Sequence, residues 1–274
     1  MDEFSSPAPE AARPPQGTLE LGRAISEGVG AALANFLQIV VVNLLFVLTL
    51  YLSCCTCVGF FVAAPVLMWG FYAFILQAID GRGQIGTLFV GFEHLSVAFF
   101  RMLGVSLCLF LIYSPIVLVV VGLMWPDLER IAQGQQPDPV MQALKTGVPM
   151  LLWSLVTVRV FIAPYFMVER DLGPLEALQA SWEVTAHHWG ALVALLLLLN
   201  LLTLPGQVLS IGAQLYAQQG SSLGPDPVSI LLQLGGFAIT MFASTLGLMF
   251  FASAYRQLTG PAPEGALGSV APGP

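Results

Sequence analysis

One arginine lies within an otherwise apolar stretch of this chain, and it is the side chain best suited to binding chemistry. Arg159 precedes Glu169 by ten residues, roughly 15 Å along a helix axis. An arginine inside a membrane helix usually faces the bundle interior or a polar cavity and pairs with another polar group. Because the apolar stretches hold no Asp or Glu, the candidate partners are Asn43, Asn200, freed backbone carbonyls or a lipid phosphate.

Two interpretations of Arg159 stay open. In the first, Arg159 contacts a ligand or a lipid together with Asn43 and Asn200. In the second, Arg159 has only a structural role. In the structural case the arginine stem packs in the apolar layer while the guanidinium reaches the membrane interface.

Three cysteines could bind a soft metal or form a disulfide in an oxidising compartment. Cys54, Cys55 and Cys57 stand where two apolar stretches reverse direction, and no His or acidic residue lies near them. We therefore expect them to pack the turn, with metal or redox chemistry as the alternative.

The histidines do not form a convincing metal site either. His187 and His188 are adjacent, so their side chains project from a helix about 100° apart, which suits shared metal binding poorly. We expect these two and His94 to be solvated interface residues. No phosphate-binding glycine loop, metalloprotease motif or nucleophile elbow occurs, so we predict a non-enzyme without catalytic, cofactor-binding or metal-binding residues.

Long apolar stretches must position these side chains. No Asp, Glu, Lys, Arg or His occurs between Asn35 and Ile79, and charged residues make up 9% of the chain, against roughly 25% in a soluble domain. A run of 18 or more apolar residues is typical of a membrane span. The sequence predicts an all-α, polytopic transmembrane helical bundle of about six spans. The predicted spans are about 36–53, 58–79, 102–125, 147–168, 189–212 and 228–255.

The basic residues predict the orientation of these spans, because cytoplasmic loops are enriched in Lys and Arg. Six basic residues fall on the side that holds both termini, and two fall on the other side. We therefore expect a multi-pass protein of the cytoplasmic (inner) cell membrane with both termini in the cytoplasm. The first group is Arg13, Arg23, Arg82, Arg101, Arg170 and Arg256, and the second is Arg130 and Lys145.

Two segments between spans have apolar residues at helical spacing, as in amphipathic helices that lie in the cytoplasmic membrane interface. The first, 86–100, carries Leu88, Phe92, Leu95 and Phe99, and the second, 175–189, carries Leu175, Leu178, Trp182 and Trp189. A similar stripe before the first span consists of Leu21, Ile25, Val29 and Leu33.

The two interfacial segments begin an internal similarity with a shift of about 90 residues. The sequence Pro137-Asp138-Pro139-Val140 recurs at 225–228, and Tyr165 and Tyr255 occupy matching places. These positions predict hairpin repeats, each an interfacial helix followed by two spans. The expected organisation is a disordered tail at 1–17, a membrane domain at 18–258 with units at about 19–80, 84–168 and 174–257, and a disordered tail at 259–274.

Two short stretches of this sequence carry a family pattern. The first is Ala163-Pro164-Tyr165-Phe166-Met167-Val168-Glu169, in which a Pro ends a span and an acidic residue follows. The second is Ala177-Leu178-Gln179-Ala180-Ser181-Trp182-Glu183-Val184-Thr185, a helix that carries Ala, Ser and Thr. They resemble uncharacterised bacterial multi-span membrane proteins related to the membrane domain of glycerophosphoryl diester phosphodiesterase. The resemblance covers mainly residues 163–190. It implies a cytoplasmic-membrane protein of about six helices without an assigned activity.

The sequence therefore predicts a non-enzymatic membrane protein with a structural, regulatory or complex-assembly role. The alternative is a transporter or lipid translocator with a site near Arg159 between helical repeats, as internal repeats and proline-interrupted helices would suit. The expected partners are membrane lipids, and a membrane-protein partner or a second copy of the chain stays open. The net charge of −7, without a block of Lys or Arg, argues against nucleic acid.

The orientation can be tested by cysteine labelling. Single cysteines replace Gln84 and Gln135 in a background without the native cysteines, and intact cells are treated with a membrane-impermeant thiol reagent. We expect labelling at position 135 from outside and at position 84 only after the membrane is opened, because the basic residues cluster on the side of Gln84. Labelling of position 84 in intact cells would reverse the predicted orientation.

Overall fold

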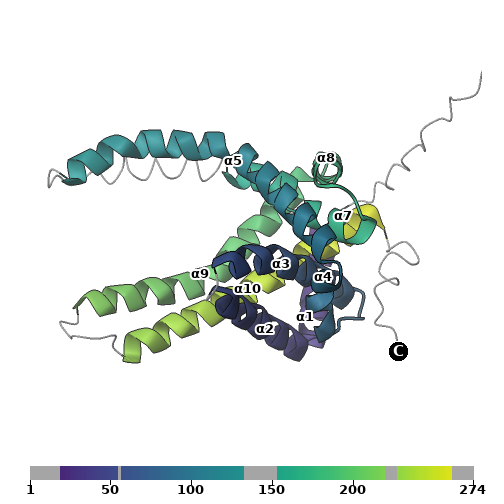
Figure 1. The fold of residues 1–274 in the computed structure, drawn as a ribbon, viewed down its shortest axis with the longest axis horizontal. Helices are drawn as coiled ribbons and strands as arrows, with labels where there is room; N and C mark the ends of the chain where they lie inside the picture. The colour runs from purple at the N-terminus through teal and green to yellow at the C-terminus, as the bar shows by residue number, and fades with distance from the viewer. Residues whose placement is uncertain (1–18, 55–56, 133–152, 220–226, 261–274) are drawn as a thin grey trace, which may run out of the picture.

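The computed structural model describes residues 19–54, 57–132, 153–219 and 227–260, and this part of the chain contains helices and no strand (Figure 1). The all-α prediction is therefore confirmed. Five helices in the described ranges are long and apolar enough to cross a membrane. They are α2 (Phe36–Cys54), α3 (Cys57–Ile79), α5 (Leu95–Ala132), α9 (Trp189–Gln219) and α10 (Pro227–Thr259).

The stretch predicted as one span at 147–168 is interrupted by a turn. Residues 153–160 are helical, a turn follows at 161–162, and α7 (Ala163–Arg170) begins there. The break has a local cause, since Pro164 has no N–H to donate to the carbonyl four residues earlier. Residues 147–152 lie outside the described ranges, so a sixth span stays a prediction.

The shorter helices differ in detail from the predicted interfacial ones. The segment 86–100 is not one helix, because η1 (Ile85–Phe89) is followed by the short α4 (Val90–Glu93), and His94 separates α4 from α5, which begins at Leu95. The second segment does form a helix, α8 (Pro174–Thr185), on which Leu175 and Trp182 are exposed. Exposed apolar side chains on such a helix are suited to contact with lipid.

Helix α3 is the central element of the bundle. Of the residues in the apolar 18-residue segment of α3, 56% are buried inside the protein, compared with 6% in the corresponding segment of α5. Its main contacts are with α1, α2, η1, α4, α5, α7 and α10. Two glycines permit this crowding, because a Cβ at Gly70 would lie 1.9 Å from the Leu88 carbonyl oxygen and one at Gly91 would lie 2.3 Å from that of Val66. The backbone of η1 and α4 therefore lies directly on α3.

Helix α1 (Leu21–Ala34) packs along α10 through small residues. Ala24, Gly28 and Ala32 are its buried positions, and a Cβ at Gly28 would lie 2.6 Å from the ring of Phe250. Of the predicted stripe, Leu21, Ile25 and Val29 are partly buried against the core, whereas Leu33 is 69% exposed. The small residues at intervals of four bring the two backbones close, and the leucines pack around that contact.

A polar contact at Glu27 also holds α1 on α10. The Ser253 hydroxyl donates to the Glu27 carboxylate at 2.7 Å, and Arg23 pairs with Glu27 on the same helix. Burial acts to raise the pKa of Glu27, but hydrogen bonds from Ser253, Arg23 and Gln257 outweigh it and lower that pKa. At a pH above the pKa of glutamate in the unfolded chain, this contact therefore stabilises the fold. Its contribution is lost as the pH falls through the lowered pKa that Glu27 has in the folded protein.

Helices α9 and α10 form a hairpin in which two glycines face one another. A Cβ at Gly206 would lie 2.6 Å from the Gly236 carbonyl oxygen, and a Cβ at Gly236 would lie 2.7 Å from that of Gly206. Because lipid tails are as apolar as leucine, close backbone packing of this kind is a main source of helix association in a membrane. Gly236 of α10 therefore serves as a packing contact within this hairpin.

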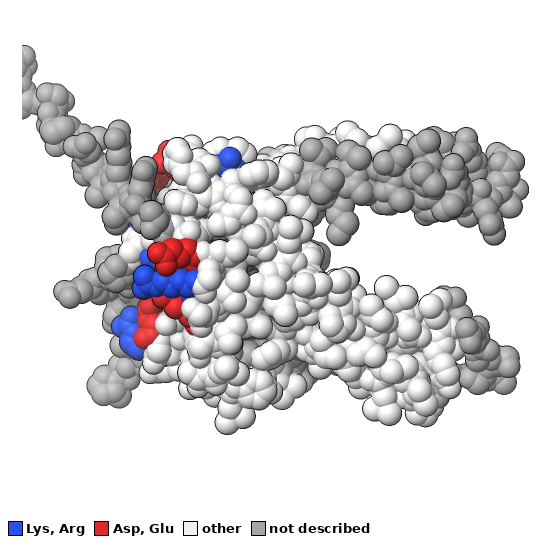
Figure 2. Space-filling model, turned by 180° about the vertical axis from the view of Figure 1, so that it is seen from behind, with Lys and Arg blue, Asp and Glu red and all other residues white. Residues whose placement is uncertain are grey.

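The bundle divides into two arms on one side (Figure 1). We call residues 110–125 the α5 arm, and residues 203–219 with 227–241 the α9–α10 arm. In Figure 2 the α9–α10 arm extends away from the rest of the molecule, and most of the charged side chains on the visible face gather at the opposite end. The principal contacts of α5 are with α3, α4, α7 and α8. The two arms are therefore joined through the centre of the bundle.

The glycine contact of the hairpin can be tested with a pair of substitutions on α9. Gly206→Ala places a methyl group against the Gly236 backbone, so we expect it to cost about 1–3 kcal/mol of stability. Gly212→Ala is the matched control, since a Cβ there meets nothing within 4 Å. Thermal unfolding in detergent should show a lower Tm for Gly206→Ala alone, and equal Tm values for the two variants would contradict this packing.

Candidate functional site

Three helices end close together at the side of the bundle away from the arms, and each ends in a left-handed residue. Helix α3 is followed by Gly81 (φ 71°), α7 by Asp171 (φ 57°) and α10 by Gly260 (φ 80°). The Arg82 N–H donates to the Gln77 carbonyl at 2.8 Å, which completes a hydrogen-bonded cap at the end of α3. These caps stop the helices where their last side chains can meet.

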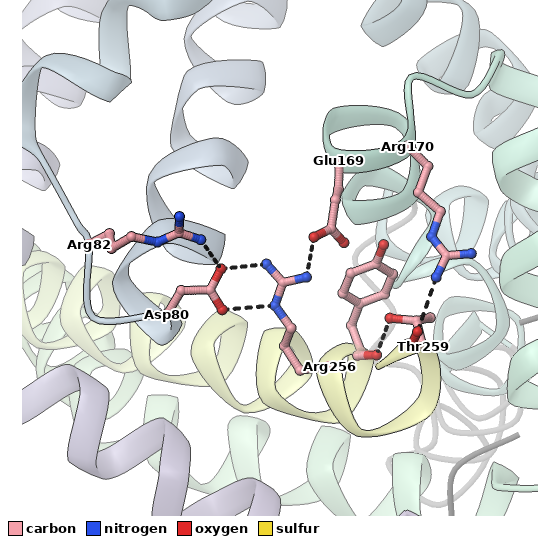
Figure 3. Close-up of polar contacts among 7 residues, drawn as sticks. Asp80, Arg82, Glu169, Arg170, Arg256 and Thr259 are labelled. Atoms are coloured by element: carbon pink, nitrogen blue, oxygen red, sulfur yellow. Dashed lines mark hydrogen bonds and ion pairs between the residues drawn. The ribbon is translucent and has the colours of Figure 1, made fainter. Parts of the chain in front are cut away.

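Arg256 joins the three helix ends through two carboxylates (Figure 3). Its Nε donates to Asp80 Oδ1 at 3.0 Å and its Nη2 donates to Asp80 Oδ2 at 2.7 Å, which forms a two-pronged ion pair. Its Nη1 pairs with Glu169 Oε1, and Arg82 Nη2 approaches Asp80 Oδ2 at 3.3 Å. We call Asp80, Arg82, Glu169 and Arg256 the charged hub.

The inner members of the charged hub are almost completely shielded from solvent. The side chain of Glu169 is 1% exposed, that of Arg256 is 10% exposed and that of Asp80 is 19% exposed, whereas Arg82 is largely exposed. Both carboxylates stand at helix C-terminal ends, where the helix dipole is negative and disfavours another negative charge. The Arg256 guanidinium compensates both, so each carboxylate depends on a cation from a different helix.

A second contact ties α7 to the end of α10. Arg170 Nη2 donates to the Thr259 backbone carbonyl at 3.2 Å, and the guanidinium carbon of Arg170 lies 5.4 Å from the centre of the Phe166 ring. A cation near a helix C-terminus interacts favourably with the carbonyls exposed there. Arg170 thus caps α10 while the charged hub holds the side of the helix.

Aromatic side chains fill the space next to the charged hub. The rings of Tyr72 and Tyr165 meet edge to face with centres 5.2 Å apart, and those of Tyr165 and Tyr255 stack with centres 5.7 Å apart, which links α3, α7 and α10 in one aromatic cluster. The Tyr165 hydroxyl donates to the Leu248 carbonyl at 2.8 Å. Tyr165, Tyr255, Phe74 and Phe166 are among the largest fully buried side chains. The centre of the bundle at this level is therefore a packed core.

Arg159 lies beside α8, at the end of the helical stretch before the break. Its Nη1 donates to the Trp182 carbonyl at 3.4 Å, and its guanidinium carbon lies 5.1 Å from the centre of the Trp182 ring. The Ser181 hydroxyl donates to the Arg159 carbonyl at 2.6 Å. The side chain is half-buried.

The two asparagines predicted to accompany Arg159 lie in separate places. The Asn43 amide donates to the Ile39 carbonyl, and its oxygen accepts from the Thr245 hydroxyl at 3.1 Å, which links α2 to α10. Asn200 is exposed on α9 and donates to the Leu196 carbonyl of its own helix. No hydrogen bond in the described part of the chain joins either asparagine to Arg159.

The structure only partly covers the predicted cysteine turn. Cys54 is a free, exposed thiol, while Cys55 and the side chain of Cys57 lie outside what is described. Among the described residues, no three His, Cys, Asp or Glu side chains gather as they would around a metal ion. His94 and His187 are exposed.

The sequence pattern contained Asp80, Glu169 and Arg256 only as charges at the ends of apolar stretches. Each ends one of the helices that return from the outer turn of a predicted hairpin. The sequence did indicate that these charges form ion pairs. Two of the helix ends carry an acidic residue and one carries an arginine, and charges so near a membrane core need partners. Which charge pairs with which depends on how the helices approach in space.

Comparison with protein families finds one family over most of the chain. The model of a domain of unknown function, DUF7847, matches residues 23–258. No curated protein and no solved structure matches the chain. The expected relation to the membrane domain of glycerophosphoryl diester phosphodiesterase is not shown by this match.

The charged hub predicts a large and selective loss of stability when one carboxylate is neutralised. Glu169→Gln leaves the buried Arg256 with Asp80 alone, and breaking a buried ion pair costs about 3–5 kcal/mol. Glu183→Gln removes an exposed carboxylate and serves as the control. Thermal unfolding in detergent should separate the two variants clearly. If both unfold at the wild-type temperature, the charged hub does not hold the helix ends together.

Proposed function

We propose that this chain, which belongs to the DUF7847 family, is a non-enzymatic scaffold that assembles a complex within the cytoplasmic membrane. One observation carries the proposal. The helices are locked together at one end by the charged hub, while the α5 arm and the α9–α10 arm extend separately from it (Figures 1 and 3). This is the geometry of a rigid frame that holds two apolar arms at a set spacing.

The use of the charged side chains supports a frame rather than a catalyst. Asp80, Glu169 and Arg256 pair with one another, and Glu27 is bound by Ser253 and Arg23. A catalytic acid, base or nucleophile needs a group that substrate can reach. The most shielded charges of the described residues are instead committed to contacts between helices.

The faces of the two arms support a partner that is itself in the membrane. Phe110 and Leu118 on the α5 arm, and Val208 and Leu231 on the α9–α10 arm, are all more than half exposed. Such surfaces bind lipid tails or the helices of another membrane protein, and helix association in lipid relies on shape and close packing. Two arms held apart by one frame offer a partner helix two surfaces at once.

The membrane and its orientation are part of the same proposal. The charged hub and α8 would lie at the cytoplasmic interface and the arms would point outward, with both termini in the cytoplasm. Three basic residues lie at the end of the bundle that holds the charged hub, namely Arg82, Arg170 and Arg256. Their position agrees with the excess of basic residues expected on the cytoplasmic side.

We further infer that the frame is built from three hairpin units. The left-handed residues Gly81, Asp171 and Gly260 close α3, α7 and α10, and they are spaced 90 and 89 residues apart. That interval matches the shift between Tyr165 and Tyr255 in the sequence. Equivalent helix ends meeting at one point are what a repeated unit would produce.

A lipid translocator with a site near Arg159 is the second candidate. The turn at 161–162 favours it, because interrupted helices line the sites of many transporters. The aromatic cluster of Tyr72, Tyr165 and Tyr255 argues against it, because these side chains fill the space between α3, α7 and α10. A path there would require these rings to move apart.

The scaffold proposal is tested by photo-crosslinking in native membranes. A photoreactive phenylalanine analogue replaces Leu118 on one arm, Val208 on the other, or Tyr51 on α2 as an equally exposed control. We expect Leu118 and Val208 to give adducts with the same protein, identified by mass spectrometry, because one partner would contact both arms. Tyr51 should give lipid adducts alone.

Two results would contradict the scaffold proposal. Lipid adducts alone at all three positions would mean that the arms contact only the bilayer. The second result would come from liposomes that contain the purified protein and a fluorescent phospholipid. We expect the rate of lipid movement between leaflets to equal the rate in protein-free liposomes. Rapid movement that is lost in Arg159→Gln would favour the translocator instead.

A further inference from the structure

The backbone around Arg159 is held in place by α8. The Arg159 carbonyl lies in the last turn before the break, and it accepts a hydrogen bond from the buried Ser181 hydroxyl at 2.6 Å. The hydroxyl of Thr185 donates to the Ser181 carbonyl at 2.7 Å, which holds the same turn of α8. The break in the helix is therefore joined to α8, and the position of the Arg159 side chain is defined relative to Trp182.

The guanidinium of Arg159 lies over the Trp182 ring, and the residue is only half-buried. The guanidinium carbon is 5.1 Å from the ring centre, and one Nη1 hydrogen reaches the Trp182 carbonyl at 3.4 Å. Stacking on an aromatic ring uses the flat face of a guanidinium and leaves its N–H groups available in the plane. Since Trp182 itself is 51% exposed, the pair lies at the surface of the protein.

Arg159 lacks a counter-charge in the described part of the chain. The ion pairs there involve Arg23, Arg82, Arg101 and Arg256, and none joins Arg159 to a carboxylate. A cation at the edge of the hydrocarbon layer is costly unless a partner anion satisfies it. At the depth where a tryptophan of an interfacial helix lies, the bilayer itself supplies phosphate groups.

We propose that Arg159 and Trp182 bind the phosphate of an anionic phospholipid in the leaflet on the α8 side. The Arg159 guanidinium donates to two phosphate oxygens, and the Trp182 ring holds the guanidinium flat beside the headgroup. The acyl chains of the lipid lie along the apolar surface of residues 153–160. This site does not depend on the scaffold role, because a structural lipid can occupy it with or without a protein partner.

A lipid, and not free phosphate, is the expected ligand. Leu155, one helical turn before Arg159, is exposed and apolar, so the surface that continues from Arg159 suits acyl chains. Phosphate free in water would lose its hydration at such a surface and gain no apolar contact. The two sources can be separated by experiment, because only the lipid has chains.

The experiment is a lipid titration of the intact, detergent-purified protein by native mass spectrometry. Phosphatidylglycerol and phosphatidylcholine with identical acyl chains are compared, so only the headgroup differs. We expect wild type to bind phosphatidylglycerol preferentially and Arg159→Gln to bind it at least about tenfold more weakly, the loss typical of one charged hydrogen bond. Arg159→Lys should recover part of the affinity, because it keeps the charge but not the planar fork.

Two further variants separate the site from general effects. Trp182→Leu keeps the cation and removes the stacking ring, so it should weaken phosphatidylglycerol binding less than Arg159→Gln does. Arg23→Gln removes a basic side chain that is 64% exposed on α1 and should bind as wild type does. Thermal unfolding of each variant without added lipid shows whether it is folded. If Arg159→Gln does not fold, the comparison of Arg159→Lys and Trp182→Leu with wild type decides.

The proposal is overturned by any of three results. The first is that Arg159→Gln binds phosphatidylglycerol as tightly as wild type does, or that Arg159→Lys and Trp182→Leu both do. The second is equal binding of phosphatidylglycerol and phosphatidylcholine by wild type. The third is displacement of the lipid by inorganic phosphate at an equal concentration, which would assign the site to free phosphate.

Discussion

The arrangement of this protein depends on one guanidinium shared by two carboxylates. Arg256 of α10 pairs with Asp80 after α3 and with Glu169 of α7, and none of these helices neighbours another in sequence. Apolar helices in lipid slide and tilt with little energetic penalty, because any apolar face is satisfied by acyl chains. A buried ion pair is different, since separating its members exposes an uncompensated charge. The charged hub therefore selects one relative position of α3, α7 and α10.

Close backbone contacts, together with the charged hub, determine which helices pack against one another. The glycines that matter lie where another backbone approaches. They are Gly70 of α3, Gly91 of α4, and Gly206 and Gly236 within the α9–α10 hairpin. In a soluble protein these contacts would be secondary to burial of apolar surface, but in lipid they are among the few forces that favour one helix partner over another. Large side chains occupy the lipid-facing surfaces, and small ones determine which helices touch.

The sequence predicted the spans better than it predicted their contacts. The limits of α2 and α3 and the start of α9 followed from where the charge-free runs begin and end, as at Ile79 and Trp189, but α9 continues to Gln219, seven residues beyond the predicted end. The start of α5 was missed because Leu95–Phe99 has the spacing of an interfacial helix and is also compatible with continuing a span. The charged hub could not be predicted in detail, because residues 80, 169 and 256 are paired by the approach of three helix ends. Arg159 was found as an unusual charge, but its neighbour Trp182 comes from a different helix.

The three-unit interpretation places a constraint on the charges at the point where the units meet. The helix ends closed by Gly81, Asp171 and Gly260 have similar backbones, so identical units would bring identical side chains together. Three like charges in a shielded place repel one another, and three apolar ends would allow the helices to shift. Two units here supply a carboxylate and one supplies Arg256, so the units must differ for the charged hub to form. On this interpretation the third unit carries the ion pairs that join the three, because Arg256 pairs with a carboxylate from each of the other two units.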